Sequence, residues 1–246
     1  MDAMYSPSML LMGVLVLLGA TVQGSVGFGF GLVVAPVAML VLPELVPGSV
    51  TFVSLVITLI LAIRERKTMG RPTGLFWILL GLLPGYWLGS RALLLLPPGQ
   101  MAYFFGGMVL VAVGISFSGV RIHPQPVTLM SAGLLTGIMS ITTTMGGPPQ
   151  AIALQELPGP RLRGTLAISF TIGSLISLSM LHAIQRFGSV ELWYGLRLLP
   201  FAILGIVLSA PLAHWLDRGG TRIAVLLLAA LAGMVVIVRQ YFFATP

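Results

Sequence analysis

The sequence predicts an all-α, polytopic membrane protein with two inverted repeats, each an interrupted hairpin helix followed by three transmembrane helices. Composition is the first observation: 57% of the 246 residues are hydrophobic and only 8% are charged, unlike a soluble domain. The second is an internal match, because the two halves align without a gap at an offset of 116 residues. The match pairs Gly31 with Gly147, Gly48 with Gly164, Trp77 with Trp193, Pro84 with Pro200 and Gly89 with Gly205. We therefore expect residues 1–120 and 121–246 to be the two membrane repeats.

Hydrophobic stretches follow one another along nearly the whole chain. In order they cover residues 8–42, 46–63, 73–96, 100–119, 126–157, 164–185, 190–216 and 221–243. The first and fifth are too long for one crossing, and each contains a run that disfavours helix, at 24–31 and 142–149. Glycine lowers helix stability and proline lacks a backbone N–H. We expect a break at each run, with new helices beginning at about Leu32 and about Pro149.

The charges of the loops distinguish two topologies for the interrupted segments, a hairpin and a kinked single crossing. With two hairpins, and the loop that contains Arg64 and Lys67 in the cytoplasm, nine basic residues lie inside and three lie at or towards the outside. With two single crossings the distribution is seven against five. Cytoplasmic loops carry the excess of Lys and Arg. The hairpin topology fits this rule better, and it makes the repeats inverted.

The two breaks predict a binding site for a small anion near the middle of the membrane. A helix that begins there presents amide N–H groups without intrahelical partners, together with the positive end of its dipole. Two such helix starts, brought together by a pseudo-two-fold axis, would bind an anion between them. Glycines would permit close approach of the backbone, and polar side chains would hydrogen-bond an oxyanion. The candidate residues are Gln23, Ser25, Gly27, Gly29, Gly31, Thr142, Thr143, Thr144, Gly146, Gly147, Pro148 and Gln150.

Two arginines, Arg91 and Arg197, lie inside hydrophobic stretches. Such placement is costly unless the side chain has a function or reaches the membrane surface. Both are candidates for a cationic lining that attracts an anion. Arg197, flanked by leucines, is the stronger candidate for this role, and for Arg91 an interfacial role is an equal alternative.

Several other classes of function find no support in the sequence. The chain has no cysteine, which excludes disulfides and thiol catalysis. Its three histidines are scattered, and no carboxylate pair or nucleophile–base pair falls at mid-membrane depth, so we expect neither an enzyme nor a bound metal or cofactor. The acidic residues all map to helix ends or loops. The net charge of +7 is explained by cytoplasmic loops rather than by nucleic-acid binding.

The run at 24–31 with Ala35 and Pro36, the matching run Gly146-Gly147-Pro148-Pro149-Gln150 and the duplicated layout resemble the sulfite exporter TauE/SafE family. Members of that family are small bacterial membrane permeases. The resemblance implies transport of small sulfur-containing anions, such as sulfite, sulfoacetate or other organosulfonates, across the bacterial inner membrane. The expected partners are the lipid bilayer and a small anionic substrate. An anion channel and a non-transporting scaffold subunit are the alternatives, and the oligomeric state, the coupling ion and the direction of transport are left open.

Overall fold

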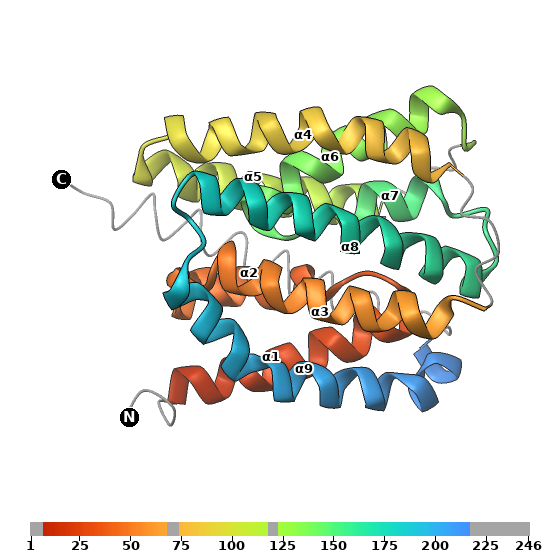
Figure 1. The fold of residues 1–246 in the computed structure, drawn as a ribbon, viewed down its shortest axis with the longest axis horizontal. Helices are drawn as coiled ribbons and strands as arrows, with labels where there is room; N and C mark the ends of the chain where they lie inside the picture. Colours follow the sequence, from red (N-terminus) through yellow and green to blue (C-terminus); the bar gives the residue numbers. More distant parts are fainter. Residues whose placement is uncertain (1–6, 68–73, 118–122, 217–246) are drawn as a thin grey trace.

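The computed structural model describes residues 7–67, 74–117 and 123–216, and this part of the chain is helical without any β-strand (Figure 1). Six of its helices are long and apolar enough to cross a membrane. The prediction of an all-α, multi-pass membrane protein is thereby confirmed. The predicted stretch at 221–243 lies outside the described residues.

The helices follow the predicted hydrophobic stretches closely. In chain order they are α1 (Pro7–Val26), α2 (Phe30–Val41), the short 3₁₀ helix η2 (Pro43–Leu45), α3 (Gly48–Glu65), α4 (Leu75–Leu95), α5 (Pro98–Phe117), α6 (Pro126–Thr143), α7 (Gly147–Ala153), α8 (Gly159–Ala183) and α9 (Ser189–Leu216). Each of the two over-long stretches is divided as predicted, the first into α1 and α2 and the second into α6 and α7.

The first break is a reversal of the chain at residues 27–29. Gly27 and Gly29 have φ angles of 96° and 119°, a region that side chains disfavour. A Cβ built on Gly19 of α1 would lie 3.1 Å from side-chain atoms of both Phe30 and Val34, so α2 folds back along α1. Because these two left-handed glycines complete the turn, α2 begins at Phe30 and not at the predicted Leu32.

The second break reverses the chain at residues 144–146. Thr144 ends α6 in the left-handed conformation, with a φ of 61°. The Thr136 hydroxyl of α6 donates to the Gly146 carbonyl at 2.8 Å, which holds the turn against its own helix. Prolines occupy the first turn of α7, where no N–H is required. The turn is complete at Gly146, so α7 begins at Gly147 and not at the predicted Pro149.

The long helices pair across the middle of the sequence. Figure 1 shows α1 beside α9 at one edge of the molecule and α4 with α6 at the opposite edge, with α3 and α8 between them. One hydrophobic core is built mostly from α1, α2, α3 and α9, and a second mostly from α4, α6, α7 and α8. Helices of residues 1–120 and 121–246 therefore contribute to both cores.

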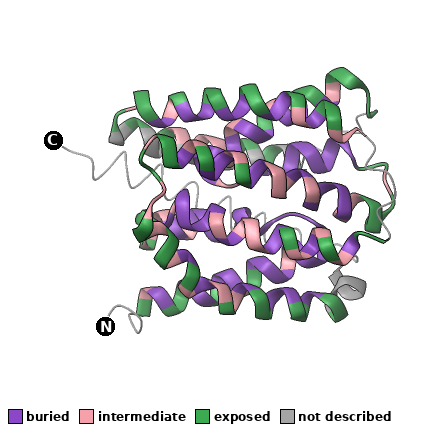
Figure 2. Ribbon diagram, viewed as in Figure 1, coloured by how far each residue is buried: buried purple, intermediate pink, exposed green. Residues whose placement is uncertain are grey.

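Glycines bring α4 and α6 into backbone contact. A Cβ on Gly81 or Gly85 of α4 would collide with the carbonyl of Met130 or Leu134 on α6, and one on Gly133 of α6 would collide with the carbonyl of Ile78. Small residues permit this close packing of membrane helices. On the outward faces, large apolar side chains such as those of α4 are exposed (Figure 2), as expected for surfaces that face lipid.

Candidate functional site

The two chain reversals meet and form one side of a small cavity, with a volume of about 40 Å³. The rest of its wall comes from α3, α4 and α8. The lining residues are Gln23, Phe28, Gly29, Gly31, Leu32, Thr51, Ser54, Tyr86, Ser140, Thr144, Met145, Gly146, Gly147, Pro148, Phe170, Ser174 and Ser177. Residues from both predicted breaks therefore line one cavity.

Two glycines allow the reversals to touch. A Cβ on Gly31 would collide with the backbone carbonyl of Thr144, and one on Gly147 would lie 2.8 Å from the Cβ of Phe28. Any side chain at either position would push the two turns apart. The close approach that the glycines were predicted to permit is thus an approach of one turn to the other.

The α1–α2 turn is held by a side chain that also lines the cavity. The backbone N–H of Phe30 donates to the Gln23 side-chain oxygen at 3.1 Å. This bond satisfies one of the N–H groups that a helix start leaves without a partner. The next two residues of α2, Gly31 and Leu32, also line the cavity.

The polar groups of the cavity wall are neutral. The hydroxyls of Thr51 and Thr144 lie 3.5 Å apart, and the Tyr86 hydroxyl shares a hydrogen bond with Ser140. The Ser177 hydroxyl is buried and has no partner among the described residues. A wall of hydroxyls and amides can donate to an oxyanion, and none of the residues that line this cavity brings a carboxylate that would repel one.

The dipole of α7 contributes less to this site than the sequence suggests. The helix contains only seven residues, and the helix dipole grows from the alignment of successive peptide units. The 12-residue α2 is the longer of the two helices that begin at the cavity. An anion at this place would therefore depend chiefly on hydrogen bonds from α2 and from the hydroxyls.

Not every residue predicted for the site lines the cavity. Gln23, Gly29, Gly31, Thr144, Gly146, Gly147 and Pro148 do, whereas Ser25, Gly27, Thr142, Thr143 and Gln150 do not. The hydroxyls of Thr142 and Thr143 donate to carbonyls of their own helix at 2.7 Å, which explains why they are not part of the cavity wall. Gln150 is fully buried, and neither polar atom of its amide has a partner among the described residues.

The two intramembrane arginines lie outside the cavity wall. Arg91 is exposed, with its guanidinium 5.3 Å from the ring centre of Trp87. Arg197 stacks over Trp193 at 4.8 Å and lines a separate surface hollow with Tyr194. Stacking of this kind stabilises a cation at a membrane surface. The participation of both arginines in anion binding stays a prediction.

Sequence reasoning missed the wall contributed by α3, α4 and α8. Its polar members are Thr51, Ser54, Tyr86, Ser174 and Ser177. The available signal was a set of hydroxyls spaced within otherwise apolar helices, since such groups often face the interior of a membrane protein. The face on which each hydroxyl lies could not be read, because these helices are apolar on all sides.

The family model described as "Sulfite exporter TauE/SafE" matches residues 11–236 of the chain. No curated protein and no solved structure matches. Since the match covers nearly the whole chain, the protein belongs to the sulfite exporter TauE/SafE family.

Proposed function

We propose that this member of the TauE/SafE family transports small sulfur-containing anions, such as sulfite or organosulfonates, across the bacterial inner membrane. The substrate binds in the cavity where the two chain reversals meet, and access alternates between the two sides of the membrane. The observation that carries this proposal is the cavity itself, with one wall built by corresponding turns of the two sequence halves.

The contacts between the turns support an inverted repeat. Gly31 corresponds to Gly147 in the 116-residue match, and Phe28 corresponds to Thr144. Gly31 touches Thr144, and Gly147 touches Phe28. The same contact is thus made twice with the partners exchanged, which is the pattern that a two-fold axis produces. The pairing of α1 with α9 and of α6 with α4 follows the same correspondence.

Both interrupted segments support the hairpin topology. In each, the second helix packs back against the first, so the chain returns towards the side from which it came. A turn of this kind is tolerated inside a membrane only where it is buried in protein or lines a cavity. Both turns meet that condition, since Gly29, Gly31, Gly146 and Gly147 line the cavity. Transporters commonly place their substrate at such interruptions.

The chemistry of the wall suits a sulfite or sulfonate group. Such a group presents several oxygens to surrounding donors, and the cavity offers hydroxyls on several helices and amides at the start of α2. The same donors would accept a carboxylate or a phosphate, so the assignment to sulfur-containing anions depends on membership of the family.

The rival functions differ in what they require of this cavity. An anion channel needs a continuous pathway, and its flux does not saturate in the manner of a carrier. A scaffold subunit needs no internal cavity with unpartnered polar groups. Catalysis would need an activated nucleophile or an acid–base pair at the cavity, and the hydroxyls that line it have no carboxylate, histidine or cysteine beside them in the cavity wall.

Flux through proteoliposomes tests the proposal directly. Labelled sulfite and sulfoacetate should enter in a saturable manner and exchange with internal anion, whereas acetate and phosphate should not. Empty liposomes and a Gly147→Leu variant serve as controls, because the leucine side chain would occupy the contact with Phe28. Normal flux through a well-folded Gly147→Leu protein would contradict the placement of the site. Linear, non-exchanging flux would indicate a channel.

A further inference from the structure

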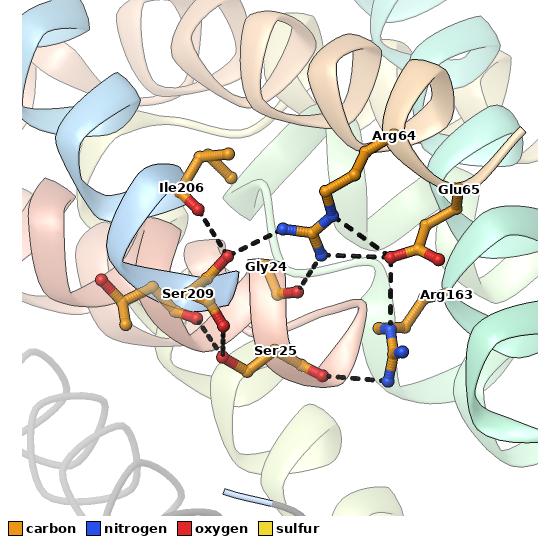
Figure 3. Close-up of polar contacts among 8 residues, drawn as sticks. Gly24, Ser25, Arg64, Glu65, Arg163, Ile206 and Ser209 are labelled. Atoms are coloured by element: carbon orange, nitrogen blue, oxygen red, sulfur yellow. Dashed lines mark hydrogen bonds and ion pairs between the residues drawn. The ribbon is translucent and has the colours of Figure 1, made fainter. Parts of the chain in front are cut away.

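Beside the cavity, an ion-pair network of two arginines and one glutamate joins α3 to α8 (Figure 3). Glu65 is the last residue of α3, and its side chain is 10% exposed. One of its oxygens, Oε1, lies 3.2 Å from Arg64 Nη2 and 3.6 Å from Arg163 Nε. The sequence places Glu65 at a helix end, which is correct, but gives no sign that its carboxylate is buried between two guanidinium groups.

The network also binds the end of α1, directly before the first chain reversal. Arg64 donates to the Gly24 carbonyl and, at 3.0 Å, to the Ser209 hydroxyl of α9. Arg163 donates to the Ser25 carbonyl at 3.4 Å. A Cβ on Gly27 would lie 3.2 Å from the Arg163 Cα. The network therefore covers the glycine turn whose other residues, Phe28 and Gly29, line the cavity.

The balance of charge at this place favours an anion. Two guanidinium groups face one carboxylate, and the carbonyl end of α1 supplies a partial negative charge of about one half. Arg163 lies near the start of α8, where the positive end of the helix dipole adds to its charge. Without Glu65, two positive charges would lie side by side under the glycine turn.

The geometry at Arg163 is incomplete with Glu65 as its partner. The Nε atom of Arg163 is buried and makes no hydrogen bond within the described residues, because 3.6 Å from Glu65 Oε1 is too long for one. A buried donor without a partner is costly. An oxyanion seated between the two arginines could approach this donor more closely than a carboxylate tethered to α3.

We propose that Arg64 and Arg163 form a second anion subsite, and that Glu65 is its internal occupant when no substrate is there. This inference rests on the proposed function. The ligand class is a small oxyanion, such as a sulfite or sulfonate group, whose oxygens pair with guanidinium as a carboxylate does. Substrate passing between the cavity and this end of α3 displaces the Glu65 carboxylate from the arginines.

Binding of sulfoacetate to the purified protein, measured by calorimetry, tests the subsite. Glu65→Gln removes the competing charge and should tighten binding at least about tenfold, corresponding to about 1.4 kcal/mol. Adding Arg163→Gln to that variant should abolish the gain. Glu44→Gln is the matched control, because Glu44 is an exposed acid in η2, just before α3 begins, and it should bind as the unmodified protein does.

A purely structural network gives a different result. Glu65→Gln would then lower the melting temperature and leave the affinity unchanged or weaker, which would overturn the subsite. If Glu65→Gln does not fold, Glu65→Asp provides the same comparison, since its shorter carboxylate should compete less well, and unchanged affinity again overturns the inference. Saturable flux with no gain in affinity would leave the proposed function intact. Absence of both binding and flux in the unmodified protein would contradict both the proposed function and the second anion subsite.

Discussion

Replacement of Gly31 by alanine tests whether the contact between the two chain reversals controls transport. The new methyl group would collide with the Thr144 carbonyl oxygen, and its next neighbours are the carbonyl carbon of the same residue at 2.7 Å and the Cα of Met145 at 3.3 Å. All three are backbone atoms, so no side chain can rotate to make room. Carbon and carbonyl oxygen require about 3.3 Å between them, and the turns must therefore separate by on the order of 1 Å.

The magnitude of the effect follows from the cost of overpacking. One extra methyl group in a well-packed interior typically costs about 1–3 kcal/mol. If that cost falls on the conformation in which the turns touch, its population relative to the other conformations falls about 5- to 150-fold. We expect Gly31→Ala to lower the maximal flux of sulfite at least about fivefold and to lower the melting temperature.

The assay is saturable sulfite flux into proteoliposomes, with thermal unfolding of the same preparation. Gly114→Ala is the matched control, because Gly114 is also a helix glycine and a Cβ there would meet no atom within 4 Å. That variant should transport like the unmodified protein. Unmodified flux and melting temperature in Gly31→Ala would refute the idea that the turns must touch.

Three other substitutions probe individual polar groups. Gln23→Glu keeps the oxygen that accepts a hydrogen bond from the Phe30 amide but adds a negative charge to the cavity wall. We expect an unchanged melting temperature and a sulfite flux reduced about tenfold or more, equivalent to about 1.4 kcal/mol. Flux equal to that of the unmodified protein would show that the substrate does not approach this side chain. Gln150→Leu removes a buried amide without described partners, so the free energy of unfolding should rise by about 1–3 kcal/mol; lower stability would mean that the amide has a structural partner. Arg197→Ala should weaken anion affinity or flux and Arg197→Lys should retain part of it, whereas normal transport by Arg197→Ala would make this residue an anchor stacked on Trp193.

The features that the sequence predicted are those encoded by local backbone chemistry. Glycine and proline runs identify both breaks, because their effect on a helix depends on few neighbours. The predicted starts of α2 and α7 were each two residues too late, since φ angles such as the 61° of Thr144 cannot be read from residue type. The equal spacing of the two breaks also predicted that they meet in one site.

The features that the sequence did not predict depend on contacts across long separations. Glu65 and Arg163 are 98 positions apart in the numbering, and their loop-like surroundings gave no sign of a buried ion pair. The hydroxyls of α3 and α8 were missed for another reason. A helix that is apolar on every side has no preferred face in the sequence, so only the packing of its neighbours decides which hydroxyls reach the cavity.

The backbone-to-backbone packing of α4 on α6 limits how this molecule can change shape. Carbonyl groups of each helix pack against glycine Cα atoms of the other. Sliding one helix along the other would therefore make carbonyl groups collide with backbone atoms. The α1–α9 pair is constrained in the same way, since a Cβ on Gly205 would collide with the Leu17 carbonyl. Each pair should therefore travel as a rigid block. For the alternating access proposed above, we expect the hinge between the blocks to lie among α3, α8 and the two glycine turns, and the protein to open by rocking rather than by shear.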